Sequence, residues 1–400
     1  MSSKTADHIV LGGGLGGLAC AYALAELGSK VVLIDRSLPE AKGALGGFTR
    51  FSGAKFSLLP AGQGLMPVAG GLGNLRKTID EVLNFCGLGG RQTIGSEDVF
   101  EDKPIAPGTN IRTYESIVLT PYEIEAAVQL ISDRVRNRVH VVDAGVNDLR
   151  RISSQWVALG SDGEIARAPV AIFAGGRTGG SLLKRAGAIP QEGKGVDLGI
   201  RVEFLDRRAI SSLRAKGPDA KILAGKTRTF CLNCPGTVFR YSFRDISIPG
   251  GIVADQSEPS GNFGILARVR GKDETVENVL NYLRSVPKDA YEAAAVVRGP
   301  PFQNKMSMLQ SAYGSDVAGQ LQSFGETMGT VGLVDWNSEH RIHFPLLDWH
   351  WDTFGVGHSH RTTEPNLFVA GDSAGHARGL LQAGVSGWLA ANEALAHATV

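Results

Sequence analysis

Three glycines near the start of the chain have the spacing of a phosphate-binding turn. Gly12, Gly14 and Gly17 follow the apolar run 9–11 and fall on the pattern G-x-G-x-x-G. In that pattern the first glycine allows a tight turn, and the second lets the backbone approach a pyrophosphate. The third lets the helix that follows pack closely against the strand. Asp35 ends the next apolar run, where a carboxylate can accept hydrogen bonds from ribose hydroxyls. The spacing therefore predicts a dinucleotide site.

The residues that follow these glycines are expected to form a helix over 15–27. Its first N–H groups, beginning at Leu15 and Gly16, have no partner inside the helix and would face a diphosphate. Arg36 leaves a choice open, because a basic residue after Asp35 can also meet a 2′-phosphate. A glycine-rich turn that binds nothing is the alternative interpretation.

A Gly-Asp pair near the other end of the chain points to a particular dinucleotide. Gly371 and Asp372 close an apolar run and precede a helix expected over 379–396. This arrangement resembles FAD proteins of the glutathione-reductase type, in which the aspartate accepts from a ribityl hydroxyl and the helix start faces the flavin ring. The two ends together indicate FAD rather than NAD. The other expected FAD contacts are Gly47, Phe48, Thr49, Ala174, Gly175, Gly379, Leu380 and Leu381.

Two side chains between this Gly-Asp pair and the helix are the candidate catalytic residues. His376 titrates near neutrality and could donate or accept a proton. Alternatively it is a surface histidine, or one that holds its loop by a hydrogen bond. Arg378 could bind a substrate carboxylate or the flavin O2, or it could be a solvated arginine.

Cys231 and Cys234 form a Cys-x-x-Cys pair with three possible roles. They could exchange electrons with a flavin as a disulfide, supply half of a zinc site, or be buried thiols. No second cysteine pair exists to complete a zinc site. We favour a structural or substrate-facing role, because the pair lies in the second predicted domain and Pro235-Gly236 after it resembles a turn of a flavoprotein family.

Histidines, aspartates and tryptophans gather in the stretch 340–360. Their spacing fits no helical metal-ligand motif, so no metal site is expected. Trp349 and Trp351 could form an aromatic wall for a substrate, or they could belong to an ordinary packed core.

The order of predicted elements indicates an α/β fold. Strand, helix, strand, a hairpin over 155–167 and a buried strand at 170–173 are expected in that order. This is the layout of a Rossmann-like FAD-binding domain in which a β-meander interrupts the alternation. We predict a discontinuous FAD-binding domain at residues 1–190 and 345–400, with a second, mixed α+β substrate domain at 191–344.

Several segments resemble a family of bacterial FAD-dependent dehydrogenases whose substrates are largely unassigned. They are the glycine-rich block 46–55, Gly-Ile-Arg-Val-Glu at 199–203, Thr-Phe-Cys-Leu-Asn-Cys-Pro-Gly at 229–236 and the closing segment 371–387. The chain departs from that family in its Cys-x-x-Cys spacing, in His376 where tyrosine is common, and in Arg378 at a glycine position. The resemblance implies a two-domain FAD oxidoreductase.

Composition and charge narrow the class of partner. The 400 residues carry a formal net charge of +1, so nothing in the balance favours nucleic acid or an anionic membrane. No apolar stretch is long enough to span a bilayer, and a cytoplasmic location is expected. The expected partner is a small-molecule substrate, and the sequence indicates no oligomeric state.

The leading functional hypothesis is hydride transfer between the flavin N5 and a small organic substrate. NAD(P)H would be a transient reductant, because no second glycine fingerprint stands mid-chain between a strand and a helix. The alternatives are an FAD-dependent monooxygenase of the para-hydroxybenzoate hydroxylase type and a catalytically inactive flavin-binding module that acts through a protein partner.

Overall fold

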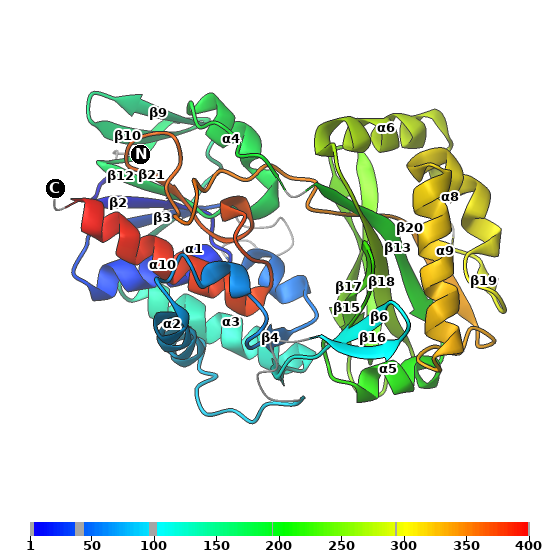
Figure 1. Cartoon of the computed structure of the whole chain (residues 1–400). Helices are drawn as coiled ribbons and strands as arrows, with labels where there is room; N and C mark the ends of the chain where they lie inside the picture. The colour runs from blue at the N-terminus through cyan, green and yellow to red at the C-terminus, as the bar shows by residue number, and fades with distance from the viewer. Residues whose placement is uncertain (1–3, 37–43, 96–101, 194, 293, 399–400) are drawn as a thin grey trace.

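The computed structural model describes residues 4–36, 44–95, 102–193, 195–292 and 294–398. They form two lobes that lie side by side, one built on a parallel sheet and the other on an eight-stranded sheet (Figure 1). We call them the parallel-sheet lobe and the eight-stranded lobe.

The sheet of the first lobe has five parallel strands, and its apolar runs explain its burial on both faces. Val10 and Leu33 point into the core on one face, whereas Ile9 and Val32 point into the core on the other. In spatial order the strands are β21 (Leu367–Val369), β12 (Val170–Phe173), β2 (His8–Leu11), β3 (Val31–Asp35) and β8 (His140–Asp143).

Helices cover one face of this sheet and a small antiparallel sheet covers the other (Figure 1). The antiparallel sheet includes the expected β-meander, so the predicted interruption of the Rossmann order is confirmed. The helices are α1 (Leu15–Glu26), α2 (Leu72–Phe85), α3 (Pro121–Arg136) and α10 (Leu380–Ala398), and the meander strands are β9 (Asp148–Ile152), β10 (Gln155–Gly160) and β11 (Gly163–Ala168).

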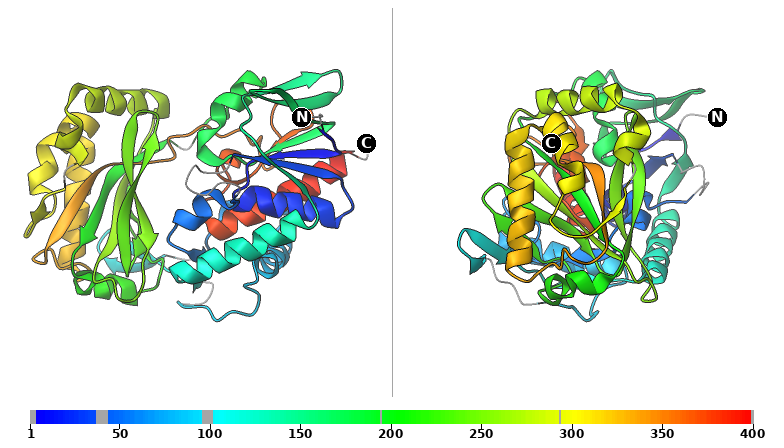
Figure 2. Two further views of the ribbon diagram at one scale, coloured as in Figure 1. Left: turned by 180° about the vertical axis from the view of Figure 1, so that it is seen from behind. Right: turned by 90° about the vertical axis from the view of Figure 1, so that its right-hand side faces the viewer.

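The first and last helices cross in direct backbone contact. Figure 2 shows α10 lying along α1, although about 350 residues separate them in the sequence. A Cβ atom added to Gly387 would lie 1.9 Å from the carbonyl oxygen of Gly16, so only glycine fits at this crossing. The two ends of the chain are therefore held together. Within the described residues no helix is long and apolar enough to cross a membrane.

The eight-stranded lobe is a mainly antiparallel sheet covered on its outer face by helices (Figure 1). The helices are α6 (Lys272–Ser285), α8 (Met306–Tyr313) and α9 (Ser315–Thr330). The strands in spatial order are β19 (Val296–Val297), β20 (His340–Asp348), β13 (Val196–Phe204), β18 (Gly261–Val269), β15 (Thr227–Asn233), β14 (Lys221–Ala224), β6 (Thr109–Arg112) and β5 (Lys103–Ala106).

A hairpin of the eight-stranded lobe faces the parallel-sheet lobe. It consists of β16 (Gly236–Phe243) and β17 (Ile246–Val253). The N–H of Val253 donates to the carbonyl of Ser52 at 3.1 Å, and Phe48 meets Tyr241 edge-on at 5.9 Å between ring centroids. The loop at 46–55 therefore lies at the junction of the two lobes.

The sheets differ from the predicted domain limits at two places. Residues 103–112 lie within the limits predicted for the FAD-binding domain, but they form β5 and β6, and β6 pairs with β14 of the eight-stranded sheet. Strand β20 also continues to Asp348, past the expected limit at 344. Sheet membership depends on backbone hydrogen bonds to distant strands, which a short segment containing proline and glycine does not reveal.

Candidate functional site

The glycine-rich turn is crowded on every side except one. Gly12 has a φ of +107°, and a Cβ there would lie 2.6 Å from the carbonyl oxygen of Ala174. A Cβ on Gly17 would lie 1.8 Å from the carbonyl oxygen of Gly12, whereas a Cβ on Gly14 would meet nothing within 4 Å. The open side is therefore at Gly14, where the pattern expects the backbone to approach a diphosphate.

Asp35 lies directly against this turn. Its Oδ2 would be 2.6 Å from a Cβ on Gly13, a glycine that the spacing pattern does not require. Burial raises the pKa of Asp35, a hydrogen bond from the Gly13 backbone lowers it, and neighbouring Asp143 raises it, for a net upward shift. Arg36 is exposed. The run of three glycines at 12–14 was the sequence signal that a side chain does not fit at position 13 either.

The loop at 46–55 is attached to the turn by backbone contacts. The N–H of Gly46, which has a φ of +109°, donates to the carbonyl of Gly13 at 2.8 Å. Gly47, Phe48 and Thr49 then form a 3₁₀ turn in which Thr49 is buried and Phe48 is 54% exposed. The expected cofactor residues of this loop therefore lie beside the glycine turn.

The end of β12 and the end of β21 meet beside the same turn. The N–H of Ala174 donates to Leu11 at 2.7 Å, and the N–H of Ala370 donates to Phe173 at 2.8 Å. Gly175 follows Ala174 at this edge of the sheet. The structure therefore brings Ala174 and Gly175 next to the glycine-rich turn.

Asp372 is engaged by Arg177, which was not among the expected site residues, and by Trp351, one of the two tryptophans considered for an aromatic wall. The Nε of Arg177 lies 3.4 Å from its Oδ2, and the indole N–H of Trp351 donates to its backbone carbonyl at 3.0 Å. Gly371, with a φ of +69°, donates its N–H to Ser386 at 2.9 Å. The sequence offered only a weak signal for the role of Arg177, namely that it is a basic residue shortly after the buried strand β12.

The start of α10 offers backbone rather than side chains to a ligand. Leu381 is fully buried in the core of the parallel-sheet lobe, and Leu380 packs against the same core. Gly379, with a φ of +133°, precedes them. At Gly379 and Leu381, therefore, only main-chain groups are available to a cofactor. The same holds for Leu15, whose side chain is buried in that core.

His376 lies in a loop that its own ring helps to hold. Its Nε2 is 2.8 Å from the carbonyl oxygen of Ser359, so this nitrogen carries the hydrogen and donates it. The ring of His360 lies 5.3 Å away, and His360 in turn is 2.9 Å from the hydroxyl of Ser386. This hydrogen bond to Ser359 supports the alternative in which His376 holds its loop in place.

Arg378 forms an ion pair with the buried carboxylate of Asp348. Burial would raise the pKa of Asp348, but Arg378, Arg228 and Arg177 hold it below its usual value, so the carboxylate is charged. The Arg378 guanidinium also lies 4.8 Å from the Phe230 ring centroid. The solvated-arginine alternative is therefore wrong.

The two cysteines of the Cys-x-x-Cys pair are free thiols in different surroundings. Cys231 has a φ of +47°. Burial would raise its pKa, but Arg201 and Lys55 bring the pKa below the usual thiol value. For Cys234, burial raises the pKa despite nearby arginines, so this thiol is neutral.

The histidines of 340–360 have separate partners. His343 lies 3.0 Å from Glu203, and His350 packs 3.9 Å from the Phe243 ring centroid. The described part of the chain contains no cluster of three ligands able to hold a metal. Trp349 and Trp351 stack at 5.3 Å.

Comparison with known proteins agrees with this geometry. Residues 7–59 match the family described as FAD binding domain, a segment that includes the glycine turn, Asp35 and the loop at 46–55. The chain therefore carries an FAD-binding fold. No curated protein matches the chain.

Solved structures with a similar overall arrangement have low sequence identity. A geranylgeranyl bacteriochlorophyll reductase-like protein from Thermoplasma acidophilum is 13% identical, with 98% of this chain and 78% of that chain covered at a TM-score of 0.45. A flavoprotein/dehydrogenase from Cytophaga hutchinsonii is 14% identical, with 98% and 80% covered at 0.45. Glycine oxidase from Geobacillus kaustophilus is 15% identical, with 98% and 95% covered at 0.42.

Proposed function

We propose that this protein is an FAD-dependent oxidoreductase that transfers a hydride between the flavin N5 and a small organic substrate. The observation that carries the proposal is the contact of α1 with α10. It supports the proposal because the glycine-rich turn and the Gly371–Asp372 pair lie close together, although they are at opposite ends of the sequence.

The residues at this site fit FAD. Gly12 and Gly17 are closed in by backbone, while the side of Gly14 is open to a diphosphate. Asp35 would hold the adenosine ribose, and Asp372 would accept from the ribityl chain. The main-chain N–H groups at the start of α10 would face the ring edge that becomes negative on reduction.

Bound FAD supplies two-electron redox chemistry, and the chain orients the reactants and limits access of water. The exposed ring of Phe48 meets Tyr241 at the lobe junction, and the Arg177 guanidinium lies 4.7 Å from the Trp351 ring centroid. These side chains form an aromatic and cationic border for a planar ring. We propose that the substrate enters between the loop at 46–55 and strand β16.

Proton transfer is the part of the proposal that concerns His376. Because its Nε2 donates to Ser359, a proton exchanged with substrate would have to be carried at Nδ1. We propose His376 as general acid or base, with Arg378 orienting the substrate through its place between Phe230 and Trp351. Transient reduction by NAD(P)H and a cytoplasmic location belong to the same proposal.

The test is an anaerobic screen of FAD-loaded protein for loss of flavin absorbance. Small metabolites, NADH and NADPH are added singly, and bleaching by at least one of them is expected. A flavin that none of them reduces would favour the inactive binding module. Hydroxylated product that forms only with oxygen would favour a monooxygenase.

The role of His376 is tested separately with His376→Ala. If the ring is the general acid or base, bleaching should slow by about a hundredfold or more, while FAD stays bound. The control is His358→Ala, which removes an exposed histidine from the same region. Equal bleaching rates in the two variants would mean that a group other than His376 donates or accepts the proton.

A further inference from the structure

A cavity at the lobe junction, away from the glycine turn, has a cationic wall. Its inner chamber has a volume of about 170 Å³ and its outer chamber about 400 Å³. The chambers share Arg214, Cys234, Pro235 and Gln256, so they are adjacent. A cleft of this size at a domain junction is typical of small-molecule sites.

The charges around this cavity are not balanced. The described lining residues include three arginines and a lysine but no aspartate or glutamate. Cys234 adds no negative charge, because burial raises the pKa of its thiol. A cavity wall of this kind favours a negatively charged ligand.

Two of the four cations have partners of their own. Lys55 donates to the carbonyls of Leu232 and Pro218 and lies 3.5 Å from Asp219. Arg208 is paired with Asp206 at 2.5 Å. These two cations are held by the protein and are not the first choice for binding a ligand.

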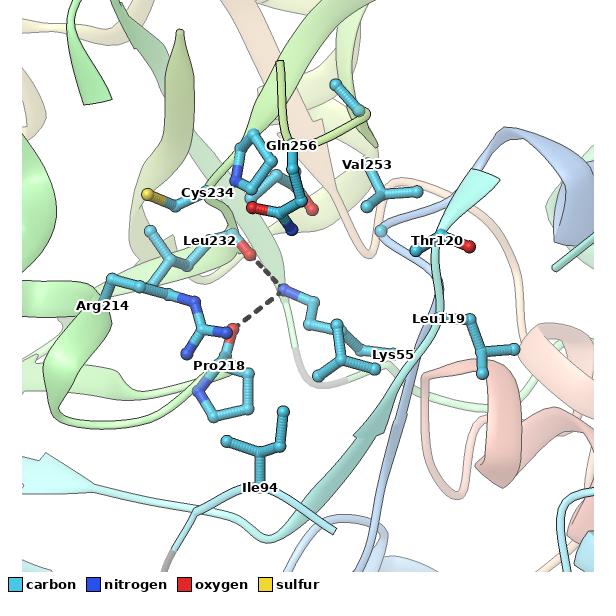
Figure 3. Close-up of a pocket in the computed structure, with 15 residues that line it drawn as sticks. Lys55, Ile94, Leu119, Thr120, Arg214, Pro218, Leu232, Cys234, Val253 and Gln256 are labelled. Carbon is cyan, nitrogen blue, oxygen red and sulfur yellow. Dashed lines mark hydrogen bonds between the residues drawn. The ribbon is translucent and has the colours of Figure 1, made fainter. Parts of the chain in front are cut away.

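Arg214 and Arg207 are the two cations left for a ligand. Neither side chain has a hydrogen-bond or ion-pair partner among the described residues, and the Nη1 of Arg207 is buried. Figure 3 shows Arg214 and Lys55 reaching the middle of the cavity from opposite sides. A guanidinium can bind a carboxylate through two parallel hydrogen bonds.

The inner chamber is lined mainly by aliphatic side chains on the side away from Arg214. Figure 3 shows Leu119, Val253 and Ile94 around it. Burying the aliphatic part of a ligand there would strengthen its binding. Leu232, which Figure 3 shows on the same side as Arg214, and Val118 are further aliphatic lining residues.

We propose that this cavity binds an organic acid, with its carboxylate on Arg214 and its aliphatic part in the inner chamber. Arg207 would provide the second positive charge at the mouth. This proposal does not depend on the proposed function, because it concerns binding alone. Lys55 and Gly53, which line the cavity, belong to the loop at 46–55, so the occupied cavity would lie next to the flavin-facing loop.

The test is calorimetric titration of the FAD-loaded protein with octanoate, octanol, octylamine and acetate. Octanoate should bind, and the other three should bind at least tenfold more weakly, because each lacks either the charge or the aliphatic part. Equal affinity for octanol or octylamine would overturn the charge argument, and equal affinity for acetate would overturn the aliphatic one. Absence of octanoate binding would overturn the proposal.

Two variants place the ligand within the cavity. Arg214→Gln should weaken octanoate binding about tenfold or more, since it removes a charge-assisted hydrogen bond. Ile94→Glu, at a side chain that is 48% exposed, should weaken it by placing a negative charge at the cavity edge. The control is Arg298→Gln, which removes an exposed arginine outside the cavity. Affinities equal to the control in both folded variants would refute the assignment.

Discussion

The crossing of α1 and α10 can be tested with a single methyl group. In Gly387→Ala the new carbon would lie 1.9 Å from the carbonyl oxygen of Gly16. Non-bonded heavy atoms need about 3.5 Å, so the two helices must separate by roughly 1.5 Å. Overpacking of this kind costs about 1–3 kcal/mol, partly offset by the roughly 0.5–1 kcal/mol that alanine gains over glycine in a helix.

The matched control is the same substitution in a helix with open space. Gly319 lies in the interior of α9, is exposed, and would place its Cβ within 4 Å of nothing. Gly319→Ala should therefore raise stability by about 0.5–1 kcal/mol. The sign of the effect should be opposite in the two variants.

The assay is thermal unfolding followed by flavin fluorescence and by circular dichroism. Gly387→Ala should unfold at a temperature about 1–3 °C lower and release FAD earlier, because the crossing joins the two parts of the proposed cofactor site. If Gly387→Ala is as stable as the wild type and retains FAD equally well, the helices do not meet as closely as described.

Two further predictions concern charged groups of the parallel-sheet lobe. Asp372→Asn should weaken FAD binding about tenfold or more, because it removes a charge-assisted hydrogen bond and leaves Arg177 without its carboxylate partner. Fluorescence titration with FAD measures the affinity. An unchanged affinity would show that Asp372 does not bind the cofactor. Burial would raise the pKa of Glu393, but hydrogen bonds from His360 hold it below the ordinary 4.5. The ionised carboxylate therefore stabilises the fold above pH 4.5, and this contribution is lost as pH falls through the lowered pKa. Glu393→Gln should be less stable than the wild type by about 1–3 kcal/mol at pH 7, and melting curves should converge as the solution is acidified; a gap that widens instead would contradict the sign.

Local patterns were sufficient to predict several elements of the parallel-sheet lobe. The strand before Gly12, the helix after it and the capping box of Thr120 with Glu123 depend on residues within a few positions of one another. The structure contains this capping box, with the Glu123 N–H donating to the Thr120 hydroxyl at 3.2 Å.

Contacts between segments that are distant in the sequence could not be predicted from such local patterns. Arg177 became notable only because folding places it beside Asp372, and Asp348 only because Arg378 reaches it from another element. The membership of 103–112 in the eight-stranded sheet has the same cause. Pairing between distant residues is decided by the fold as a whole, whereas the sequence pattern records local preference.

The place of β21 and α10 in the parallel-sheet lobe also determines the order in which the chain can fold during synthesis. The eight-stranded sheet is complete once residue 348 has been made, whereas the five-stranded sheet still lacks β21 at that stage. Because segments fold as they leave the ribosome, the eight-stranded lobe can mature while its neighbour waits for residues 367–398. The proposed flavin site, which needs both ends of the chain, would therefore be completed only at a late stage of synthesis.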